Sequence, residues 1–352
     1  MYSTNNISEQ LLRWFQKSKR PMPWRKTHDP YKIWLSETML QQTQVKTVIP
    51  FYNKWVKKYP NFESVASADL DALLKMWEGL GYYNRCRNFH KAVKLIVHDF
   101  GSSLPIDVQE FKALPGVGDY TAAAVYSIVL SHPIPTIDGN VNRVMSRLLR
   151  IRHLTSCNKK RILSKLKIWI DKAQPGDFNQ AMMELGSTVC LPKNPKCEIC
   201  PLILSCVGFN SGKPESYPSP KPQKSVPWRN VLTGVIWNDD SFLILQRKGY
   251  SHLSHLWELP GGKTTEKNGH HSQLTELLKD KYQLTVSVKN KIGEIQHRYS
   301  HFGITLSGFN CKLLNGESPH GNQPFRWIKK NEINRFAFPK ANHKLFAMMK
   351  EN

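Results

Sequence analysis

The sequence has 352 residues, of which 40% are hydrophobic and 22% are charged. This composition is typical of a folded protein and excludes an intrinsically disordered chain. Lysine and arginine number 50 against 27 aspartate and glutamate residues, which gives a formal net charge of +23. A surface this basic attracts polyanions, and nucleic acid is the most common such partner, although charge alone leaves an inert basic surface open.

No apolar run is long enough to cross a membrane, and the first ten residues, MYSTNNISEQ, lack the pattern of a signal peptide. We therefore expect a cytoplasmic protein without a membrane partner, associated with the nucleoid if the source is bacterial. Disulfides are rare in that compartment, so the seven cysteines need another explanation.

Residues 1–206 carry helical signals almost throughout. Ser8 is expected to cap a first amphipathic helix. The segment DLDALLKMWEGLGYY repeats the helical periodicity, and Gly79 is expected to end that helix. Asp107 and Asp138 are placed to cap two further helices, the second of which carries a clear apolar stripe. This part of the chain is predicted to be nearly all-α.

The composition changes after residue 206. Residues 207–228 are rich in Pro, Ser, Gly and Lys without an apolar period, which is typical of a linker. Beyond them, VLTGVIW, FLILQRK, LTVSVKN and GITLSGFNCKLL are short strand-like runs, and SQLTELLKDKY is a helical segment between them. Residues 229–352 are therefore predicted to form an α+β domain.

Four cysteines with the spacing C-x6-C-x2-C-x5-C fall within 17 residues; they are Cys190, Cys197, Cys200 and Cys206. Four thiolates on one short, loop-rich segment can enclose a single metal centre. Zinc and an iron–sulfur cluster both accept four sulfurs, so the ligand type alone does not separate them.

The segment LPGVGDYTA predicts a tight turn between two helices. Gly116 and Gly118 carry no side chain, so the backbone can turn sharply there and come close to a ligand. The helix that follows presents unpaired N–H groups and its positive dipole end, which suit a phosphate. The alternative is a plain helix–helix corner that binds nothing.

Two carboxylates stand in unequal surroundings. Glu37 lies among apolar residues of a predicted helix, near Trp34 and Leu40, where burial would raise its pKa and suit it to general acid catalysis. Asp138 opens a helix, where backbone N–H groups favour its ionised form. An acid beside a fixed anion is a catalytic arrangement, whereas the plainer alternatives are a solvated helix face for Glu37 and a simple cap for Asp138.

These motifs together resemble a known family. The cysteine spacing and the LPGVG turn resemble the endonuclease III superfamily of helix-hairpin-helix DNA glycosylases. The segments WLSETMLQQTQV, GLGYYNRCRN, LPGVGDYTA, DGNVNRV and FNQAMMELG resemble its adenine DNA glycosylase branch, MutY. The resemblance is dense over residues 7–206 and looser in the second half.

The resemblance implies a multidomain fold. An all-α glycosylase region over residues 1–206 would combine a six-helix barrel module, about 22–133, with a cluster module of residues 1–21 and 134–206. A linker at 207–228 and a Nudix-like lesion-recognition domain at 229–352 would follow. The resemblance also favours one 4Fe–4S cluster over zinc as the metal centre of the four cysteines. It further implies a monovalent cation bound at the hairpin and a monomeric protein.

The implied activity is removal of adenine paired with 8-oxoguanine or guanine in double-stranded DNA, leaving an abasic site. Glu37 matches the catalytic acid of the family, Asp138 the group that stabilises the sugar cation, and Asn140 a neighbouring hydrogen-bonding position. The positions that match substrate or DNA contacts are Trp24, Arg25, Gln42, Tyr82, Gly116, Val117, Gly118, Gln180, Tyr299, Ser300 and His301.

Tyr120 bears on the kind of glycosylase. Superfamily members that also nick the strand carry a lysine at this place, whose amine forms a Schiff base with the sugar. A phenol cannot do so, which favours a monofunctional enzyme over a bifunctional pyrimidine-damage glycosylase of the endonuclease III type.

Two further alternatives come from other classes. A Nudix hydrolase needs a run of metal-binding glutamates, whereas the expected helix offers only Glu276 and Asp280, with Lys279 between them. A non-catalytic iron–sulfur protein that binds DNA or senses redox state would not need both Glu37 and Asp138. A lesion-recognition role therefore fits the second half better.

Overall fold

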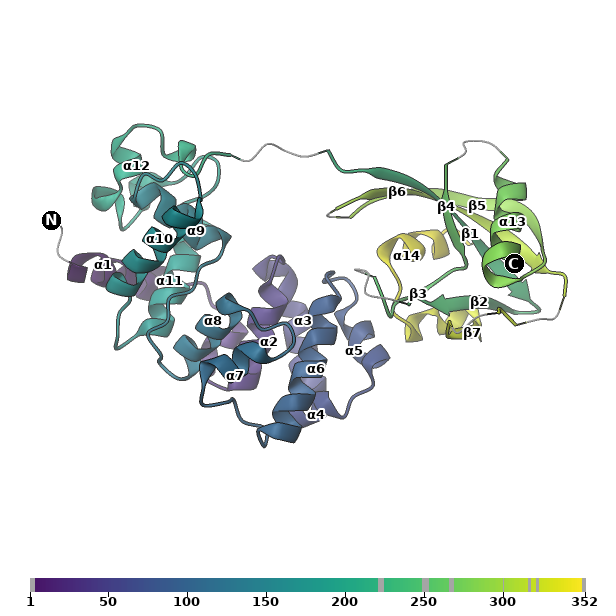
Figure 1. Ribbon diagram of the computed structural model, residues 1–352, viewed down its shortest axis with the longest axis horizontal. Coiled ribbons are helices and arrows are strands. Elements are labelled where there is room, and N and C mark those ends of the chain that lie inside the picture. The colour runs from purple at the N-terminus through teal and green to yellow at the C-terminus, as the bar shows by residue number, and fades with distance from the viewer. Residues whose placement is uncertain are drawn as a thin grey trace. The chain divides into compact units, whose positions relative to one another are not determined.

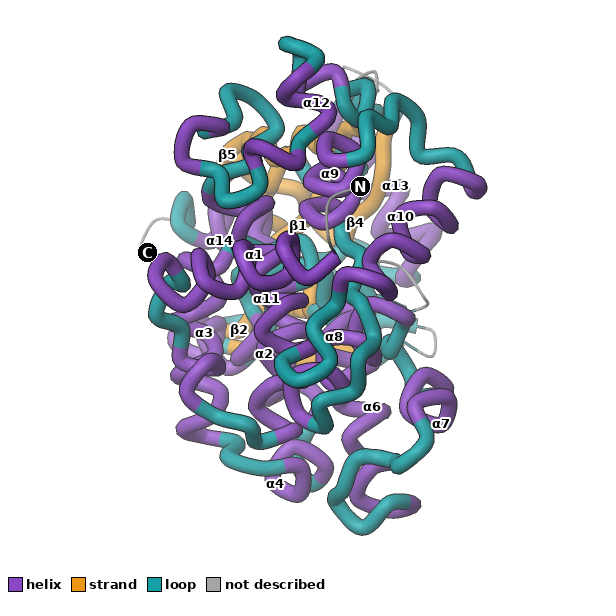
Figure 2. Tube along the Cα trace, turned by 90° about the vertical axis from the view of Figure 1, so that its left-hand side faces the viewer, coloured by secondary structure: helices purple, strands orange, loops and turns teal. Residues whose placement is uncertain are grey.

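The computed structural model describes residues 4–220, 225–248, 253–265, 269–299, 301–315, 318–320 and 323–349. The chain divides into two compact units: residues 1–67 with 88–222, and residues 68–87 with 223–352. The first is built from helices and loops, and the strands belong to the second (Figures 1 and 2). Within the described residues, no helix is both long and apolar enough to span a bilayer.

The helices of the first unit begin and end close to the sequence signals. They are α1 (Thr4–Ser18), α2 (Pro30–Leu40), α3 (Val45–Lys58), α4 (Phe62–Ala66), α6 (Asn84–Asp99, which crosses the division), α7 (Val108–Ala113), α8 (Asp119–Val129), α9 (Gly139–Leu148), α10 (Ser156–Trp169), α11 (Pro175–Thr188) and α12 (Val207–Asn210). Short 3-10 helices lie at Pro23–Lys26, Cys197–Ile199, Ile203–Ser205 and Pro214–Ser216.

Two of the predicted caps in this unit are confirmed and one is wrong. Asp107 accepts a hydrogen bond from the N–H of Gln109, and Asp138 from that of Val141. Ser8, in contrast, lies inside α1, buried and without a hydrogen-bond partner for its hydroxyl among the described residues. The helix begins earlier because its apolar face already includes Ile7, which packs into a core.

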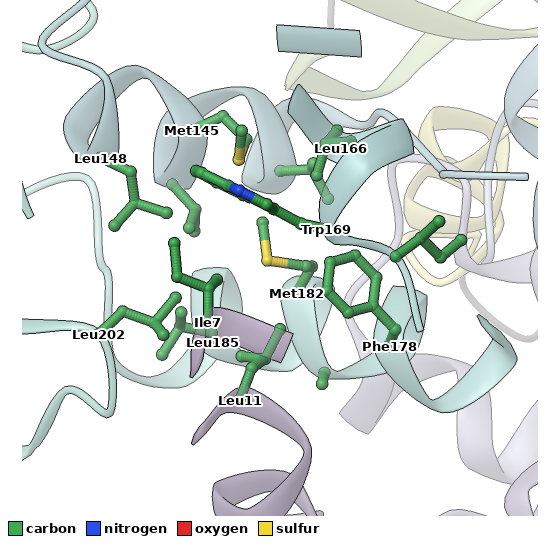
Figure 3. Close-up of a cluster of buried hydrophobic side chains, with 14 of the residues drawn as sticks. Ile7, Leu11, Met145, Leu148, Leu166, Trp169, Phe178, Met182, Leu185 and Leu202 are labelled. Carbon is green, nitrogen blue, oxygen red and sulfur yellow. The ribbon is translucent and has the colours of Figure 1, made fainter. Parts of the chain in front are cut away.

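Two apolar clusters organise this unit. In the first, the ring of Trp34 makes edge contacts with those of Phe89 and Phe111. The second joins α1 to α9, α10 and α11, so the N-terminal helix packs against segments more than 120 residues away in the sequence (Figure 3). The predicted apolar stripe of α9 faces this second cluster; it consists of Val141, Val144, Met145 and Leu148.

The predicted linker is wrong in its first half, because residues 207–219 fold onto the helical unit. A Cβ at Gly208 would lie 2.6 Å from the carbonyl oxygen of Arg147, so α12 sits directly against α9. Tyr217 is buried, and its carbonyl and hydroxyl oxygens accept hydrogen bonds from Arg147 and Arg150. This segment is held by polar contacts, so its sequence shows no apolar periodicity. For this reason its composition alone indicated a linker.

The second unit is built on one seven-stranded sheet. Its strands are β1 (Trp228–Asn238), β2 (Ser241–Gln246), β3 (Trp257–Glu258), β4 (Gly261–Thr264), β5 (Val286–Arg298), β6 (Gly303–Leu313) and β7 (Phe325–Ile328). The order is β3-β2-β1-β6-β5, with β4 paired to β1 and β7 to β2, and the central β1–β6 pair is parallel. The four predicted strands are confirmed, whereas β3, β4 and β7 are only two to four residues long and carry little pattern.

Helices cover both faces of this sheet. Leu274 and Leu278 of α13 (His270–Tyr282) pack on one face, and Leu345 of α14 (Lys340–Phe346) packs on the other. Along β2 the side chains alternate between the two clusters, as the pleat requires. The predicted helical segment SQLTELLKDKY is confirmed as part of α13. With a helix on each face, the sheet is the middle of three layers.

Residues 68–87 group with the sheet rather than with the helical unit. They include α5 (Leu70–Trp77), whose predicted end at Gly79 is confirmed by a positive φ of 106°. The Asp71 carboxylate accepts hydrogen bonds from Trp257 and Gln246, and Glu78 accepts one from the N–H of Phe338. These hydrogen bonds attach residues 68–87 to the unit that contains the sheet. The sequence instead predicts that they belong to the helical region, residues 1–206.

Candidate active site

The first unit contains a cavity of about 670 Å³. The end of α2, the starts of α3, α8 and α9, and one face of α11 all contribute to its lining. Glu37, Tyr120, Asp138 and Asn140, which come from three distant segments of the sequence, all line it. The structure therefore brings the predicted catalytic residues together.

Glu37 lies near the end of α2 with only 4% of its surface exposed. Burial raises its pKa to about 7, and the charge of Asp138 acts in the same direction, whereas the hydrogen bond from Tyr120 and the charge of Arg25 oppose the shift. Leu40 lines the cavity with it, but Trp34 packs in the aromatic cluster instead. A carboxyl with this pKa holds a proton for a large part of the time at neutral pH.

Asp138 is held as a fixed acceptor. One of its carboxylate oxygens receives the N–H of Val141 at 2.6 Å, and the other receives the side-chain amide of Asn140 at 3.0 Å. The residue caps α9, so the positive end of the helix dipole also faces it.

Asn140 is itself fixed by its neighbours. Its amide oxygen accepts a hydrogen bond of 2.8 Å from Arg143, whose guanidinium also donates to the carbonyl oxygens of Gly186 and Cys190. A Cβ at Gly186 would lie 2.6 Å from the Cβ of Asn140, so only glycine fits there without a shift. Hydrogen bonds therefore connect Asp138 to the cysteine-containing segment.

Tyr120 stands in the first turn of α8. Its hydroxyl donates a hydrogen bond of 2.8 Å to Oε2 of Glu37 and lies 3.1 Å from the sulfur of Met183. Burial, followed by the charge of Glu37, raises the pKa of this phenol well above its usual value. Tyr120 is therefore a neutral donor that orients the Glu37 carboxyl.

The other predicted pocket residues also line the cavity. Trp24 is 4% exposed and packs edge-on against Tyr52, at 5.2 Å between ring centroids. Arg25 donates hydrogen bonds of 3.0 Å to Gln180 and to Glu184. The structure thus joins the segment before α2 to α11 through Arg25.

Two residues of this network, Arg20 and Glu184, were not predicted. Glu184 has a side chain that is 2% exposed, and its carboxylate is paired with Arg20 at 2.6 Å and with Arg25 at 3.0 Å. Burial opposes the ionised form, but these two arginines lower the pKa of Glu184. The available signal was a single charged residue, a glutamate, in the stretch FNQAMMELG, four residues after Gln180.

The hairpin between α7 and α8 corrects one part of the sequence prediction. Gly116 has a φ of 79°, and a Cβ there would lie 2.7 Å from the Cβ of Asn88, so the turn needs glycine at this position. Gly118 has an ordinary φ of −103° and no heavy atom within 4 Å of the place of a Cβ. Val117 is buried. Gly118 therefore leaves an open approach to the N-terminus of α8 and does not make the turn.

The predicted DNA-wedging residues fall in different units. Gln42 lines the cavity with Glu37 and has a positive φ of 58°. Tyr82, with a φ of 49°, belongs to the second unit, where it lines a separate cavity of about 380 Å³ with Tyr299 and His301. Ser300 lies outside the described residues. The structure therefore brings Tyr82 together with the predicted recognition loop.

Hydrogen-bond donors point at the sulfurs of the four-cysteine segment that follows α11. Arg147 donates to Sγ of Cys190 at 3.2 Å, and the N–H of Phe209 to Sγ of Cys206 at 3.4 Å. Burial raises the pKa of Cys200 to about 12, and the neighbouring cysteines act in the same direction. Among the residues that the structure describes, no three His, Cys, Asp or Glu side chains are arranged as a closed metal site. Four cysteine thiols on one segment, two of them with a donor directed at the sulfur, are nevertheless a ligand set of the kind that iron–sulfur clusters use.

Comparison with known proteins identifies the family. Residues 35–185 match the HhH-GPD superfamily of base excision DNA repair proteins, and residues 232–348 match the NUDIX domain. An adenine DNA glycosylase of Buchnera aphidicola from Schizaphis graminum is 35% identical over 85% of this chain and 86% of that protein. The chain belongs to the adenine DNA glycosylase family. The human adenine DNA glycosylase is 31% identical to it over 96% of this chain and 72% of the human protein.

Solved structures support a DNA glycosylase fold for the helical half. A thermostable thymine-DNA glycosylase is 27% identical to this glycosylase over 58% of its chain and 95% of the other, with a TM-score of 0.54. Endonuclease III in a non-covalent DNA complex matches 60% of the chain at 23% identity and a TM-score of 0.52, which shows a shared fold. The predicted combination of a helix-hairpin-helix glycosylase domain and a Nudix-like domain is confirmed, as is the predicted class of enzyme, a DNA glycosylase of base excision repair.

Proposed function

We propose that this glycosylase removes adenine paired with 8-oxoguanine or guanine in double-stranded DNA and leaves an abasic site. One observation carries the proposal: a buried carboxyl with a pKa near 7, Glu37, shares a cavity with a second, hydrogen-bonded carboxylate, Asp138. Relatives with the name adenine DNA glycosylase support adenine as the base.

Glu37 acts as the general acid. Its proton passes to a ring nitrogen of the extruded adenine, which turns the base into a neutral leaving group. The N-glycosidic bond then breaks, the electron pair leaves with the base, and positive charge develops on the sugar as in glycoside hydrolysis. Water attacks the anomeric carbon and gives one proton to the Glu37 carboxylate, which completes the abasic site and restores the acid.

Asp138 stabilises the developing cation. Hydrogen bonds from Val141 and Asn140 fix its two oxygens. The Asp138 carboxylate is therefore already in place when positive charge develops on the sugar, and it does not have to reorganise. Asn140 positions Asp138 and offers a further polar contact to the nucleotide.

Tyr120 explains why strand cleavage is not expected. A lysine at this place would supply an amine for a Schiff base, whereas Tyr120 donates a hydrogen bond to Glu37. The enzyme is therefore proposed to be monofunctional.

DNA is proposed to approach the cavity over the hairpin. The open face at Gly118 and the N–H groups of α8 suit a backbone phosphate, with a monovalent cation as a further ligand of the turn. The extruded base would lie among Trp24, Arg25 and Gln180, which line the cavity. Removal of adenine from the stack leaves a gap opposite its partner base. The residues proposed to contact this gap and the partner base are Gln42, Tyr82, Tyr299, Ser300 and His301.

The four cysteines are proposed to hold one 4Fe–4S cluster. Bound there, the cluster would supply a rigid cross-link for the loop after α11, and the N–H groups directed at the sulfurs would support it. Loss of iron on replacement of Cys200 by Ser, measured as iron per chain, tests this assignment. Unchanged iron content in that variant and in the matching Cys206→Ser variant would contradict it.

The function is tested by base release from duplexes that carry adenine opposite 8-oxoguanine, guanine or thymine, beside a thymine glycol duplex. Adenine release from the first two, with no capture of the protein on DNA by borohydride, is the expected result. Release of thymine glycol without adenine, or efficient borohydride capture through residue 120, would overturn the proposal. The thymine-paired adenine duplex is the matched substrate control.

A further inference from the structure

The loop between α5 and α6 belongs to the unit that contains the sheet. The chain before residue 68 and, up to the linker, after residue 87 belongs instead to the helical unit. Tyr82 lies in this loop, half-buried and with a φ of 49°. A left-handed conformation is costly for a bulky residue, so it persists only where neighbouring groups hold it. The contacts of the loop therefore decide where the ring of Tyr82 stands.

Part of this support is local. The indole N–H of Trp77 donates a hydrogen bond to the carbonyl oxygen of Gly81 at 3.1 Å, and Arg85 donates to the same oxygen at 3.0 Å. The guanidinium of Arg85 lies 5.3 Å from the ring of Trp77 and 5.6 Å from that of Tyr82. These contacts come from α5 and α6, so they shape the loop but do not attach it to the sheet.

Glu78 supplies such an attachment. It is the C-cap residue of α5, and its side chain is 18% exposed. Its Oε1 accepts hydrogen bonds from the N–H of Phe338 at 2.8 Å and from Nε2 of His343 at 2.6 Å. Its Oε2 accepts one from Lys75 at 2.6 Å, and Lys75 also donates to the carbonyl oxygen of Phe336 at 2.8 Å. Burial opposes ionisation, but the hydrogen bonds from His343 and Lys75 lower the pKa of Glu78, so it is a carboxylate at neutral pH.

The groups that bind Glu78 near α14 are part of a packed core. Phe338 is fully buried and belongs, with Leu345, to the apolar cluster on the α14 face of the sheet. His343 lies within α14, with its ring edge-on to that of Phe338 at 5.9 Å between centroids. Hydrogen bonds to an ionised group are stronger than those between neutral groups. Glu78 therefore ties the loop firmly to α14, four residues before Tyr82, and both residues line the cavity of about 380 Å³.

We infer that Glu78 is a positioning residue, which fixes Tyr82 for DNA binding by tying the α5–α6 loop to α14. Without Glu78 the loop would leave this conformation for part of the time, and the apparent affinity for DNA would fall with the fraction that is lost. The change does not touch Glu37 or Asp138, so the rate of base release from fully bound DNA should stay the same. The inference rests on the DNA contact proposed for Tyr82 and assigns control of that contact to the unit that contains the sheet.

Hydrogen exchange of the full-length protein without DNA tests the positioning itself. In Glu78→Ala, the backbone amides of residues 79–83 should exchange at least about tenfold faster than in wild type. Glu78→Gln keeps an acceptor for Phe338 and His343, so it should restore slow exchange. Glu276→Ala, which changes an exposed glutamate of α13, is the matched control. Wild-type exchange in Glu78→Ala would overturn the inference. Should that variant fail to fold, His343→Ala removes one donor, leaves Glu78 in place and is expected to give the same change at smaller amplitude.

Affinity for DNA tests the consequence. Each variant is combined with Glu37→Gln, so that a duplex with adenine opposite 8-oxoguanine stays intact while its Kd is measured by fluorescence anisotropy. Glu78→Ala should raise the Kd by about tenfold, and Glu78→Gln by less than about threefold. In a Tyr82→Ala background, Glu78→Ala should have little further effect, because a positioning residue acts through the group that it positions. A full tenfold loss in that background would show a role that does not pass through Tyr82 and would overturn the inference.

The rate of base release separates positioning from damage to the active site. With Glu37 intact and protein in excess over the Kd, Glu78→Ala should release adenine at the wild-type single-turnover rate, and a clear fall would contradict the inference. Absence of adenine release from the wild-type protein would contradict the proposed function and leave the exchange and affinity tests of Glu78 in place. Unchanged Kd in Tyr82→Ala would instead remove the DNA contact of Tyr82, and with it this inference, while the role of Glu37 stands.

Discussion

The hydroxyl of Tyr120 donates a hydrogen bond of 2.8 Å to Oε2 of Glu37, and both side chains are withdrawn from solvent. This contact fixes the direction of the carboxyl and opposes the rise in its pKa that burial causes. The acid is therefore tuned to about 7, close to the pH at which general acids work best in neutral solution.

The rate of base release should depend on the protonation of Glu37. With a pKa of about 7, the carboxyl holds its proton below that pH and loses it above, so the single-turnover rate should fall as the pH rises past 7. Glu37→Gln removes the proton donor but keeps the shape, and should lower the rate by about 10²–10⁴-fold. A rate that stays constant from pH 6 to pH 9 would contradict the assignment. Glu110→Gln, an exposed change on α7, is the control.

The pH dependence of protein stability should also reflect the raised pKa of Glu37. The pKa of Glu37 is raised from 4.5 to about 7, so between these pH values the folded state binds more protons than the unfolded state. The free energy of unfolding therefore falls as the pH rises through this window, by up to about 3 kcal/mol for this residue. Urea unfolding of wild type and Glu37→Gln at pH 5 and pH 8 should show a smaller fall in the variant. An equal fall in both proteins would argue against the shifted pKa.

Tyr120→Phe should shift the pH profile without abolishing activity. The hydrogen bond from Tyr120 lowers the pKa of Glu37, so its removal should raise that pKa and carry the activity to higher pH. The measurement is the pH dependence of adenine release in both proteins. A shift to lower pH, or loss of activity at every pH, would show that the phenol has another role.

Asp138→Asn should separate the charge of this residue from its capping role. Asparagine caps helices about as well as aspartate, so the melting temperature should change little. The negative charge near the sugar is lost, and the rate of adenine release should fall by about 10²-fold or more. Asp107→Asn, at the cap of α7, is the matched control and should leave the rate unchanged. A slow but stable Asp138→Asn protein supports the electrostatic role, whereas wild-type activity excludes it.

Local patterns predicted most of the elements of this molecule. The cap at Asp138 and the stripe that follows it depend only on neighbouring residues, and both are confirmed. The burial of Glu37 could also be anticipated, because the segment around it is largely apolar. The four longer strands were predicted for the same reason.

Features that depend on distant contacts could not be predicted in this way. Glu184 is buried because Arg20 and Arg25, about 160 residues away, pair with it. Residues 207–219 fold because Arg147 and Arg150 bind the backbone and hydroxyl of Tyr217. Ser8 carries the chemistry of a cap, but the packing of Ile7 extends the helix past it. In each case tertiary packing overrides a local preference.

The two glycines of the hairpin should respond differently to alanine. At Gly116, with a φ of 79° and Asn88 only 2.7 Å from the place of the new Cβ, alanine forces both an unfavourable backbone conformation and a steric clash. Gly116→Ala should therefore lower the free energy of unfolding by about 1–3 kcal/mol. At Gly118, the ordinary φ of −103° and the open space around it leave stability nearly unchanged. A methyl group there would stand in the path of a phosphate that approaches α8, so Gly118→Ala should weaken DNA binding, measured by fluorescence anisotropy on an uncleaved duplex. Equal DNA affinity in Gly118→Ala and wild type would show that the hairpin is a structural corner and not the phosphate site.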